Sequence, residues 1–396
     1  MSNSLTASDK QSWARKMQIV REKELVALGF CNFELRAGLK TGYRAHKPYR
    51  SKMAAQSYTK GTAFTVQDIS STNEYLDVDT AKCVPFYVDD IDDMQNTYNT
   101  KDDFRVDAIN DLDEVVDADI LSEYSNATSS MYAADIGETG ATTPIIVSQG
   151  NIMRIINKMK AKLRNLRVKK NLFVVFSPSM VSMLELYLGG KDTAWGDEVG
   201  KNGFVGKVSG VKILVSDNLT QTAKWTPADQ PTTGATLTIG GRTITLVTAL
   251  TGGADEVLVT TNTATTLDNL VAFLNLGNGA ATANYTVQSA DTKAAFNTGM
   301  VAVDGATYIT ITYKGGGESA LASSEAADPW SLQQIHILGG QDGAIDLVMQ
   351  KYPSVESKDI SDKLGVNIVA WMNYGKKTFL KQKDALVHIV VDQNEL

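Results

Sequence analysis

The sequence has little of what enzymes use for chemistry. Its 396 residues include three histidines, two cysteines and eight prolines. Cys31 and Cys83 lie far apart in the sequence, so we expect free thiols in a reducing compartment and no disulfide framework. No apolar run approaches the ~18 residues of a membrane span, and the N-terminal stretch lacks the apolar core of a secretory signal. These absences predict a soluble protein that is made and used in a cytoplasm.

Residue patterns for catalysis or metal binding are also missing. His46, His336 and His388 have no neighbouring cysteine and no H-E-x-x-H spacing. His336 and His388 fall in apolar segments, which favours satisfied core histidines. The sequence contains no G-x-S-x-G elbow and no glycine-rich phosphate loop. We therefore expect no catalytic, cofactor-binding or metal-binding residues, and not an enzyme.

One group of carboxylates follows a predicted strand: Asp89, Asp90, Asp92 and Asp93. Paired carboxylates can serve general acid–base catalysis. No histidine, lysine or pocket glycine accompanies these four, so we interpret them as turn and solvent-facing residues.

Charge is distributed unevenly along a chain whose net charge is only −7. This mild acidity argues against a protein whose main task is gripping nucleic acid. Helical spacing over Thr100–Tyr124 carries acidic residues, without the glycine of an EF-hand loop. We expect a solvated face, or one that repels a polyanion. The acidic residues are Asp102, Asp103, Asp107, Asp111, Asp113, Glu114, Asp117, Asp119 and Glu123.

The opposite charge dominates a second predicted helix, Asn151–Val168. Its apolar stripe alternates with lysines and arginines that continue to Lys170. Two interpretations stay open for this basic face. It contacts nucleic acid or an acidic face of a neighbouring subunit, or it is a solvated face that pairs with the acidic helix of its own domain.

The N-terminal quarter predicts extensions. Ser8–Leu28 has helical spacing with Gly29 as its stop, and it either docks on a neighbouring subunit or packs on its own domain. Ala63–Ile69 and Asn73–Asp89 predict a long hairpin. A two-stranded hairpin is marginal alone in water, so another copy of the chain is a natural support. Pro85 fits an edge strand.

The second half predicts a main domain interrupted by a β-rich module. Asn171–Phe176 is a buried strand, followed by Ser177-Pro178 as the start of a helix. Gly203–Thr220 predicts two short strands bent at glycines. From Trp225 to Asp328 threonine rises and lysine and arginine nearly vanish, with a Gly240-Gly241 hairpin and a helix capped by Thr266. After Pro329 the earlier composition returns.

The order of these elements resembles that of the major capsid proteins of tailed bacteriophages, which have the Hong Kong 97 fold. The hairpin ending in Val84–Asp90 is similar to that family's extended loop, and Thr100–Tyr124 is similar to its spine helix. Three further segments are similar to its axial-domain entry, its glycine-rich strand pair and its closing strands: Leu172–Pro178, Gly203–Asn218, and Leu364–Trp371 with Asp384–Val387.

The resemblance implies an α+β fold with four parts. These are an N-terminal arm over 1–50, an extended loop hairpin over 51–90, a capsid core of peripheral and axial domains over 91–224 and 329–396, and an inserted β-rich domain over 225–328. The family's long N-terminal scaffolding extension is missing here, which implies a separate scaffolding protein. The cross-linking lysine and asparagine of some members match no position in this chain.

The implied function is self-assembly into the icosahedral shell of a virion, in the cytoplasm of a bacterial host. The expected partners are other copies, as hexamers and pentamers, with portal, scaffolding and decoration proteins, around double-stranded DNA bound without sequence specificity, and no membrane. Two alternatives remain. One is another virion structural protein such as a tail tube subunit, and the other is a glycan-binding surface protein that uses the threonine-rich module.

Overall fold

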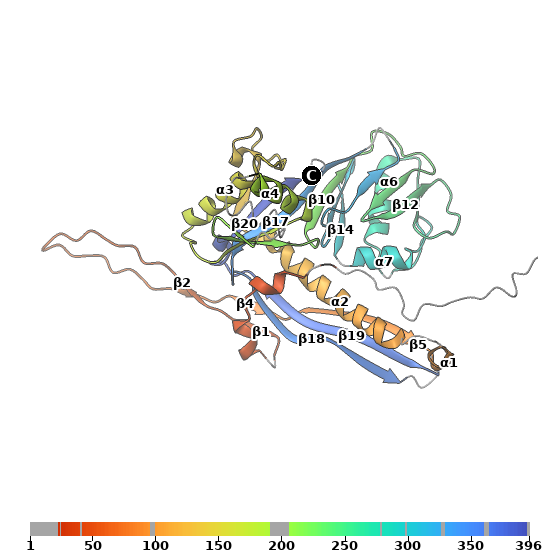
Figure 1. Cartoon of the computed structure of the whole chain (residues 1–396), viewed down its shortest axis with the longest axis horizontal. Coiled ribbons are helices and arrows are strands. Elements are labelled where there is room, and N and C mark those ends of the chain that lie inside the picture. The colour runs from red at the N-terminus through yellow and green to blue at the C-terminus, as the bar shows by residue number, and fades with distance from the viewer. Residues whose placement is uncertain are drawn as a thin grey trace, which may run out of the picture. The chain divides into compact units, whose positions relative to one another are not determined.

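The computed structural model describes residues 23, 25–39, 42–95, 100–190, 206–277, 279–297, 299–325, 329–359 and 364–393. The chain forms two compact units, which are described separately (Figure 1). Unit 1 comprises Met1–Glu22, Ala81–Leu112 and Lys351–Met372, and unit 2 comprises Lys23–Thr80, Asp113–Gln350 and Asn373–Leu396. Most of the helix predicted over Ser8–Leu28 lies outside the described residues. Its described end is a 3₁₀ turn, η2 (Ala27–Phe30), which contains Gly29 and does not stop there.

Unit 1 is built on a three-stranded sheet in the order β18-β19-β5. The strands are β5 (Thr80–Val88), β18 (Asp346–Asp359) and β19 (Val366–Lys377). The first half of helix α2 (Thr100–Leu121) packs on it, with the rings of Phe86 and Phe104 6.1 Å apart. Arg105 also donates a hydrogen bond to Ser357 Oγ at 3.0 Å. A short helix, α1 (Asp90–Gln95), follows β5.

The long hairpin predicted for Ala63–Asp90 is wrong in its pairing. Ala63–Ile69 forms no strand, and Thr80–Val88 belongs to the sheet of unit 1, next to β19. The local pattern identified an extended segment but not its partner, because that partner comes from the other end of the chain. The edge position of β5 accommodates Pro85, whose missing N–H would interrupt a central strand.

Unit 2 is organised around a nine-stranded sheet, in the order β14-β15-β10-β17-β7-β9-β8, with β20 paired to β17 and β6 paired to β20. Strand β7 is buried along its whole length, as its apolar run predicts. The strands are β6 (Ser129–Met131), β7 (Leu172–Phe176), β8 (Lys207–Val208), β9 (Val211–Val215), β10 (Thr220–Trp225), β14 (Met300–Asp304), β15 (Ile309–Tyr313), β17 (Trp330–Gln341) and β20 (Leu386–Asp392).

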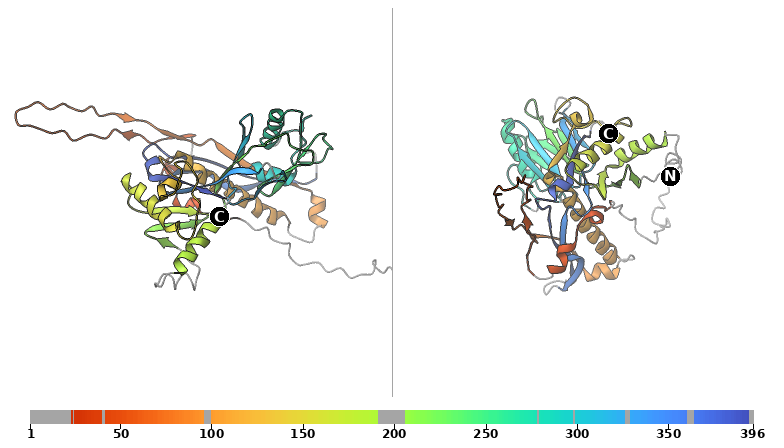
Figure 2. Two further views of the ribbon diagram at one scale, coloured as in Figure 1. Left: turned by 90° about the horizontal axis from the view of Figure 1, so that it is seen from above. Right: turned by 90° about the vertical axis from the view of Figure 1, so that its left-hand side faces the viewer.

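Two helices, α3 (Ile152–Asn165) and α4 (Pro178–Gly189), lie beside this sheet in both views of unit 2 (Figures 1 and 2). The apolar stripe of α3 is buried, as predicted. At Gly339 of β17 an added Cβ would lie 2.4 Å from Met159 Sδ, so the missing side chain lets α3 approach the sheet. Pro178 is the first residue of α4, but Ser177 makes no side-chain capping hydrogen bond.

The threonine-rich segment folds against this same sheet. A second sheet, in the order β13-β12-β11-β16, contains the predicted hairpin, whose Gly240 and Gly241 both have positive φ. Helix α6 (Thr263–Leu274) begins earlier than predicted, because Asn262 and not Thr266 accepts the capping hydrogen bond from Ala264 N. The remaining elements are α7 (Ala290–Asn297), β11 (Thr236–Ile239), β12 (Arg242–Val247), β13 (Glu256–Leu258) and β16 (Leu321–Ser323).

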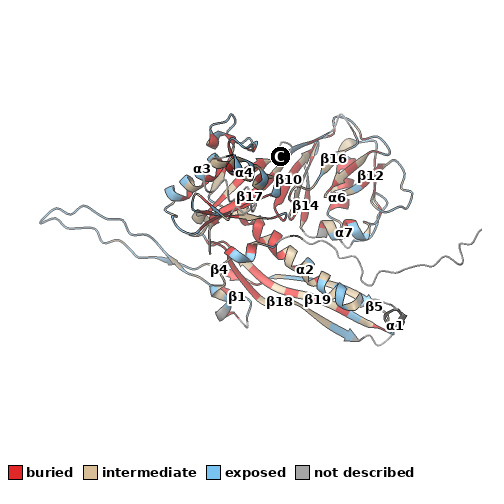
Figure 3. Ribbon diagram, in the orientation of Figure 1, coloured by how far each residue is buried: buried red, intermediate tan, exposed pale blue. Residues whose placement is uncertain are grey.

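The threonine-rich segment shares a sheet with the rest of unit 2. Strand β10 pairs with β17 on one side and with β15, from within the threonine-rich segment, on the other. The fully buried Trp225 joins a core with Phe273 and Ile309. Strands β9 and β17, which precede and follow the segment, lie in one sheet on either side of β7. Figure 3 shows buried residues on the strands of both sheets of unit 2.

Candidate assembly site

The most exposed feature of unit 2 is a long arm formed by residues 49–72 (Figures 1 and 2). Two short strands close its base, where β2 (Tyr49–Arg50) pairs with β3 (Ser71–Thr72). Beyond these strands the two segments of the arm run side by side without a regular ladder of backbone hydrogen bonds. The side chain of Gln67 takes the place of the ladder, since its amide donates to Ala54 O at 2.6 Å and accepts from Ala54 N at 3.0 Å.

Apolar side chains cover this arm although nothing in the described chain buries them. Phe64, Val66 and Ile69 have 70%, 78% and 73% of their surface exposed. Met53 and Tyr58 of the facing segment are also more than half exposed, and together these residues line a hollow of about 720 Å³. Monomeric proteins rarely expose a contiguous apolar surface, so such a patch marks a contact with another macromolecule.

The base of the arm is fixed by a half-buried ion pair. Lys47 Nζ donates to the carboxylate of Asp346 at 2.6 Å, and Asp346 is fully buried. The Asn32 amide donates to the other oxygen of that carboxylate at 2.5 Å. Two small strands, β1 (Arg44–His46) and β4 (Tyr75–Asp77), pair beside it, with Arg44 gripping Asp77 through two hydrogen bonds. The arm therefore extends from a rigid support.

The second half of α2 contradicts the expectation of a solvated acidic face. Asp117 is 1% exposed. Its carboxylate accepts from Val26 N at 2.9 Å, from Ala27 N at 2.6 Å and from the Asn218 amide at 3.0 Å. Burial raises the pKa of Asp117, and these three donors partly offset that rise. The helix thus holds the start of the described chain, η2, through a carboxylate.

Asp119 and Glu123 form ion pairs with lysines, whereas Asp117 accepts hydrogen bonds from amides. Asp119 accepts from Lys314 Nζ at 2.7 Å and lies 3.1 Å from Lys376 Nζ. Burial by itself raises the pKa of Asp119, but Lys376 and Lys314 outweigh it and hold the pKa below its usual value. Glu123 accepts from Thr378 Oγ1 at 2.7 Å. Three carboxylates on and just after the second half of α2 therefore connect η2, the end of β15 and the end of β19.

His336 and His388 are core histidines, as their apolar surroundings predict, and they contact one another. His336 Nδ1 lies 2.8 Å from His388 Nε2, and His336 Nε2 lies 2.8 Å from Thr222 Oγ1. The ring of Tyr124 stacks on the His336 imidazole, with centroids 4.4 Å apart, and lies tilted against that of His388 at 4.5 Å. Burial lowers the pKa of His336 to about 3, with a contribution from His388, whose own pKa burial lowers to about 4. Both rings are neutral at pH 7.

The remaining predicted residues do not converge. Cys31 and Cys83 are free thiols, and burial raises the pKa of Cys31 far above its usual value. Asp89 accepts from Ile91 N at 2.9 Å, which is turn chemistry at the start of α1. Within the described residues no three histidine, cysteine, aspartate or glutamate side chains are placed to hold a metal. The same residues include no helix long and apolar enough to cross a membrane.

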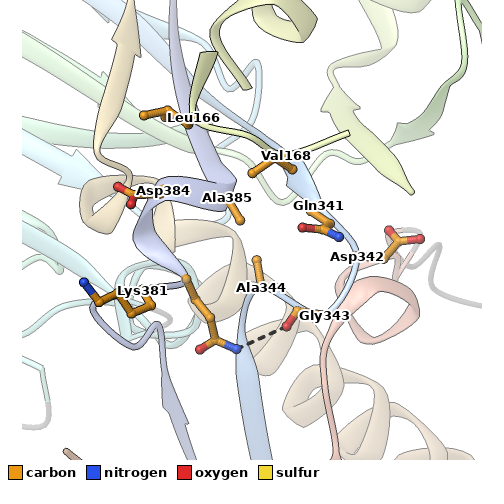
Figure 4. A pocket seen from close by; sticks show the side chains of 10 residues that line it. Leu166, Val168, Gln341, Asp342, Gly343, Ala344, Lys381, Asp384 and Ala385 are labelled. Carbon is orange, nitrogen blue, oxygen red and sulfur yellow. Dashed lines mark hydrogen bonds between the residues drawn. The ribbon is translucent and has the colours of Figure 1, made fainter. Parts of the chain in front are cut away.

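One further hollow lies between β17 and the turn before β20 (Figure 4). It has a volume of about 310 Å³, and Asp342, Lys381 and Asp384 are its charged residues. Gln382 Nε2 donates to Gly343 O at 3.3 Å across its wall. The Asp342 carboxylate and the Asp384 carboxylate lie on opposite sides in Figure 4, so they do not form a common binding site.

Comparison with solved structures identifies the fold. A structure from Mycobacterium phage Che8 matches 99% of this chain and 100% of its own, with a TM-score of 0.60 and 14% identity. The capsid structure of cyanophage P-SCSP1u covers 99% of this chain and 95% of its own, with a TM-score of 0.56 and 12% identity. The capsid of a native GTA particle covers 98% and 99%, with a TM-score of 0.52 and 9% identity.

Sequence comparison adds nothing to these matches, since no family model and no curated protein matches the chain. At such low identity the structural likeness speaks for the fold alone. It extends over almost the whole chain and almost the whole of each matched structure. The chain therefore has the mixed α+β fold of these phage capsid structures.

Proposed function

We propose that this chain is the major capsid protein of a tailed bacteriophage, with a Hong Kong 97-type fold. Copies of it assemble into an icosahedral shell that encloses double-stranded DNA. The observation that carries the proposal is the likeness along 99% of the chain to a solved phage structure at a TM-score of 0.60. The protein acts by association, and its place is the virion, after assembly in the bacterial cytoplasm.

The arm supplies the mechanism of association. Its apolar residues gain by burial about 25 cal/mol per Å² of surface removed from water, and none of the described residues buries them. The half-buried Lys47–Asp346 pair fixes the direction of the arm, which lowers the entropy lost on binding. We infer that the arm of one copy lies across a neighbouring copy, within hexamers and pentamers.

The parts of the subunit follow the same proposal. We assign residues 1–50 to an N-terminal arm and 51–90 to the extended loop, which contains most of the exposed arm of residues 49–72. Residues 91–224 and 329–396 are assigned to the capsid core, and 225–328 to an inserted β-rich domain. Because β14 and β15 complete the sheet of unit 2, the inserted segment stabilises the core in addition to whatever it contacts outside. Scaffolding, portal and decoration proteins are the remaining expected partners.

Electron microscopy of the purified full chain tests the function. The proposal predicts closed shells, alone or with a co-expressed scaffolding protein. Rings or open tubes under the same conditions would support a tail tube subunit in its place. Glycan binding by the threonine-rich segment, in a protein that forms no particles with or without scaffold, would support the surface-protein alternative.

A further inference from the structure

The feature that the fold leaves unexplained is a cluster of cations at the end of α3. Residues 151–170 contain eight lysines and arginines and no acidic residue. The structure uses three of the eight internally. Arg154 donates to Ile136 O, Lys160 contacts Ser209, and Lys162 donates to Ser130 O and pairs with Asp135 at 2.8 Å. The predicted pairing of this helix with the acidic helix α2 is therefore replaced by one ion pair with Asp135.

Four of the remaining cations form what we call the basic corner: Arg164, Arg167, Lys169 and Lys170. All four are exposed, and the described part of the chain places no carboxylate in an ion pair with any of them. Four like charges within seven residues repel one another in the free subunit. A cluster of this kind is stabilised only when an anionic partner neutralises it.

The backbone at the basic corner places one of the four cations, Arg167, in a left-handed conformation. Arg167 N donates to Arg164 O, and Val168 N donates to Leu163 O, which together close the end of α3. Arg167 takes the position at which helices commonly end with glycine, with φ of 70°. A left-handed conformation costs free energy for any residue with a Cβ. Arg167 at this position therefore lowers the stability of the free subunit relative to a glycine.

The chain itself carries a complementary surface. Asp103, Asp107 and Asp111 repeat every four residues on α2, so they form one row, which we call the acidic row. Asp103 is exposed and Asp107 is half-buried. Like charges at this spacing destabilise a helix, and within the described residues neither Asp103 nor Asp107 forms an ion pair. Both surfaces are repeated in every copy of the chain.

We propose that the basic corner of one copy binds the acidic row of a second copy. This contact joins two different surfaces, so it runs head to tail and closes when copies form a ring. The proposal rests on the proposed shell function and names one of its contacts. A genome phosphate backbone is the weaker partner for the corner, because the chain as a whole is acidic.

Charge reversal tests the contact in the full chain. We expect Arg164→Glu with Lys169→Glu and Lys170→Glu to lower the assembled fraction about tenfold at ~0.1 M salt, where charges in contact lie within the Debye length of about 10 Å. Adding Asp103→Lys and Asp107→Lys to the same chain restores opposite charges, so it should restore assembly. Sedimentation of particles gives the fraction. Lys293→Glu, which reverses a partly exposed cation of α7 in the threonine-rich segment, is the charge-reversal control and should assemble like the parent.

Arg167→Gly separates assembly from folding. Glycine relieves the left-handed backbone, so its thermal midpoint should equal or exceed that of the parent, while its assembled fraction falls. The contact is contradicted if the triple reversal assembles like the parent, if the aspartate reversals do not rescue it, or if the control loses assembly equally. A triple reversal that forms normal shells but no longer retains DNA would assign the corner to nucleic acid. A parent that forms no shells overturns the proposed function itself.

Discussion

Two regions of unit 2 reverse the usual distribution of polar and apolar residues. On α2, Asp117 is 1% exposed, whereas on the arm Val66 is 78% exposed. The buried carboxylates have all their partners inside the subunit, and the exposed apolar side chains have none there. The comparison teaches that stability and association are separated in this protein. Substitutions of the buried carboxylates on the second half of α2 should therefore change folding, and substitutions on the arm should change assembly.

The largest effect is expected at Asp117. Asp117→Ala leaves Val26 N, Ala27 N and the Asn218 amide without their acceptor, and each buried unpaired donor costs about 1–3 kcal/mol. We expect a loss of at least about 3 kcal/mol in the free energy of unfolding, measured by urea denaturation. Asp117→Asn keeps one acceptor oxygen and should lose less. Equal stability of the alanine variant and the parent would contradict the claim that the buried carboxylates of α2 stabilise the fold.

Acid should have the second-largest effect, through the histidine pair. An unfolded histidine has a pKa near 6.5, whereas the folded pKa values are about 3 for His336 and about 4 for His388. Between these values the unfolded chain binds more protons than the folded one. Stability from the pair is therefore complete above about pH 6.5 and falls as the pH drops, by about 3 kcal/mol for each histidine at pH 4.

Urea denaturation at pH 7 and pH 4 measures this loss. His336→Gln with His388→Gln removes the titrating groups and should flatten the pH dependence between those values. A variant as acid-sensitive as the parent would assign the effect to carboxylates instead.

A smaller effect is expected from the half-buried ion pair that joins α2 to the end of β15. Lys314→Met removes the 2.7 Å contact with Asp119, which retains Lys376. We expect a loss of about 1 kcal/mol in unfolding free energy. Arg242→Met breaks the more exposed pair with Asp291 and is the control, with about 0.5 kcal/mol or less. If the two variants lose the same amount, burial does not distinguish these pairs.

The sequence predicts the local features of this fold well. The apolar run of β7, the Gly240-Gly241 turn and the buried stripe of α3 all follow from spacing and turn chemistry, and the structure confirms them. Pro85 indicated an edge strand before its sheet was known. Each of these signals is contained within a few neighbouring residues.

The features that depend on distant residues were not predictable in the same way. Asp117 is buried because backbone amides about ninety positions earlier donate hydrogen bonds to it, and the residues next to Asp117 in the sequence carry no signal of these partners. His336 and His388 meet through the register of β17 and β20, which periodicity does not specify. The arm shows the same limit, since β5 pairs with β19 and not with Ala63–Ile69.

The most direct measurement compares folding and assembly in one arm variant. Phe64→Ser with Val66→Ser alters only exposed side chains, so its unfolding free energy should stay within about 0.5 kcal/mol of the parent. Thr65→Ala, an exposed neighbour on the same arm, serves as the control. Electron microscopy should show closed shells for the parent and the control, and only unassembled folded subunits for the double variant. Normal shells from the double variant, or its unfolding, would contradict the separation of stability from association.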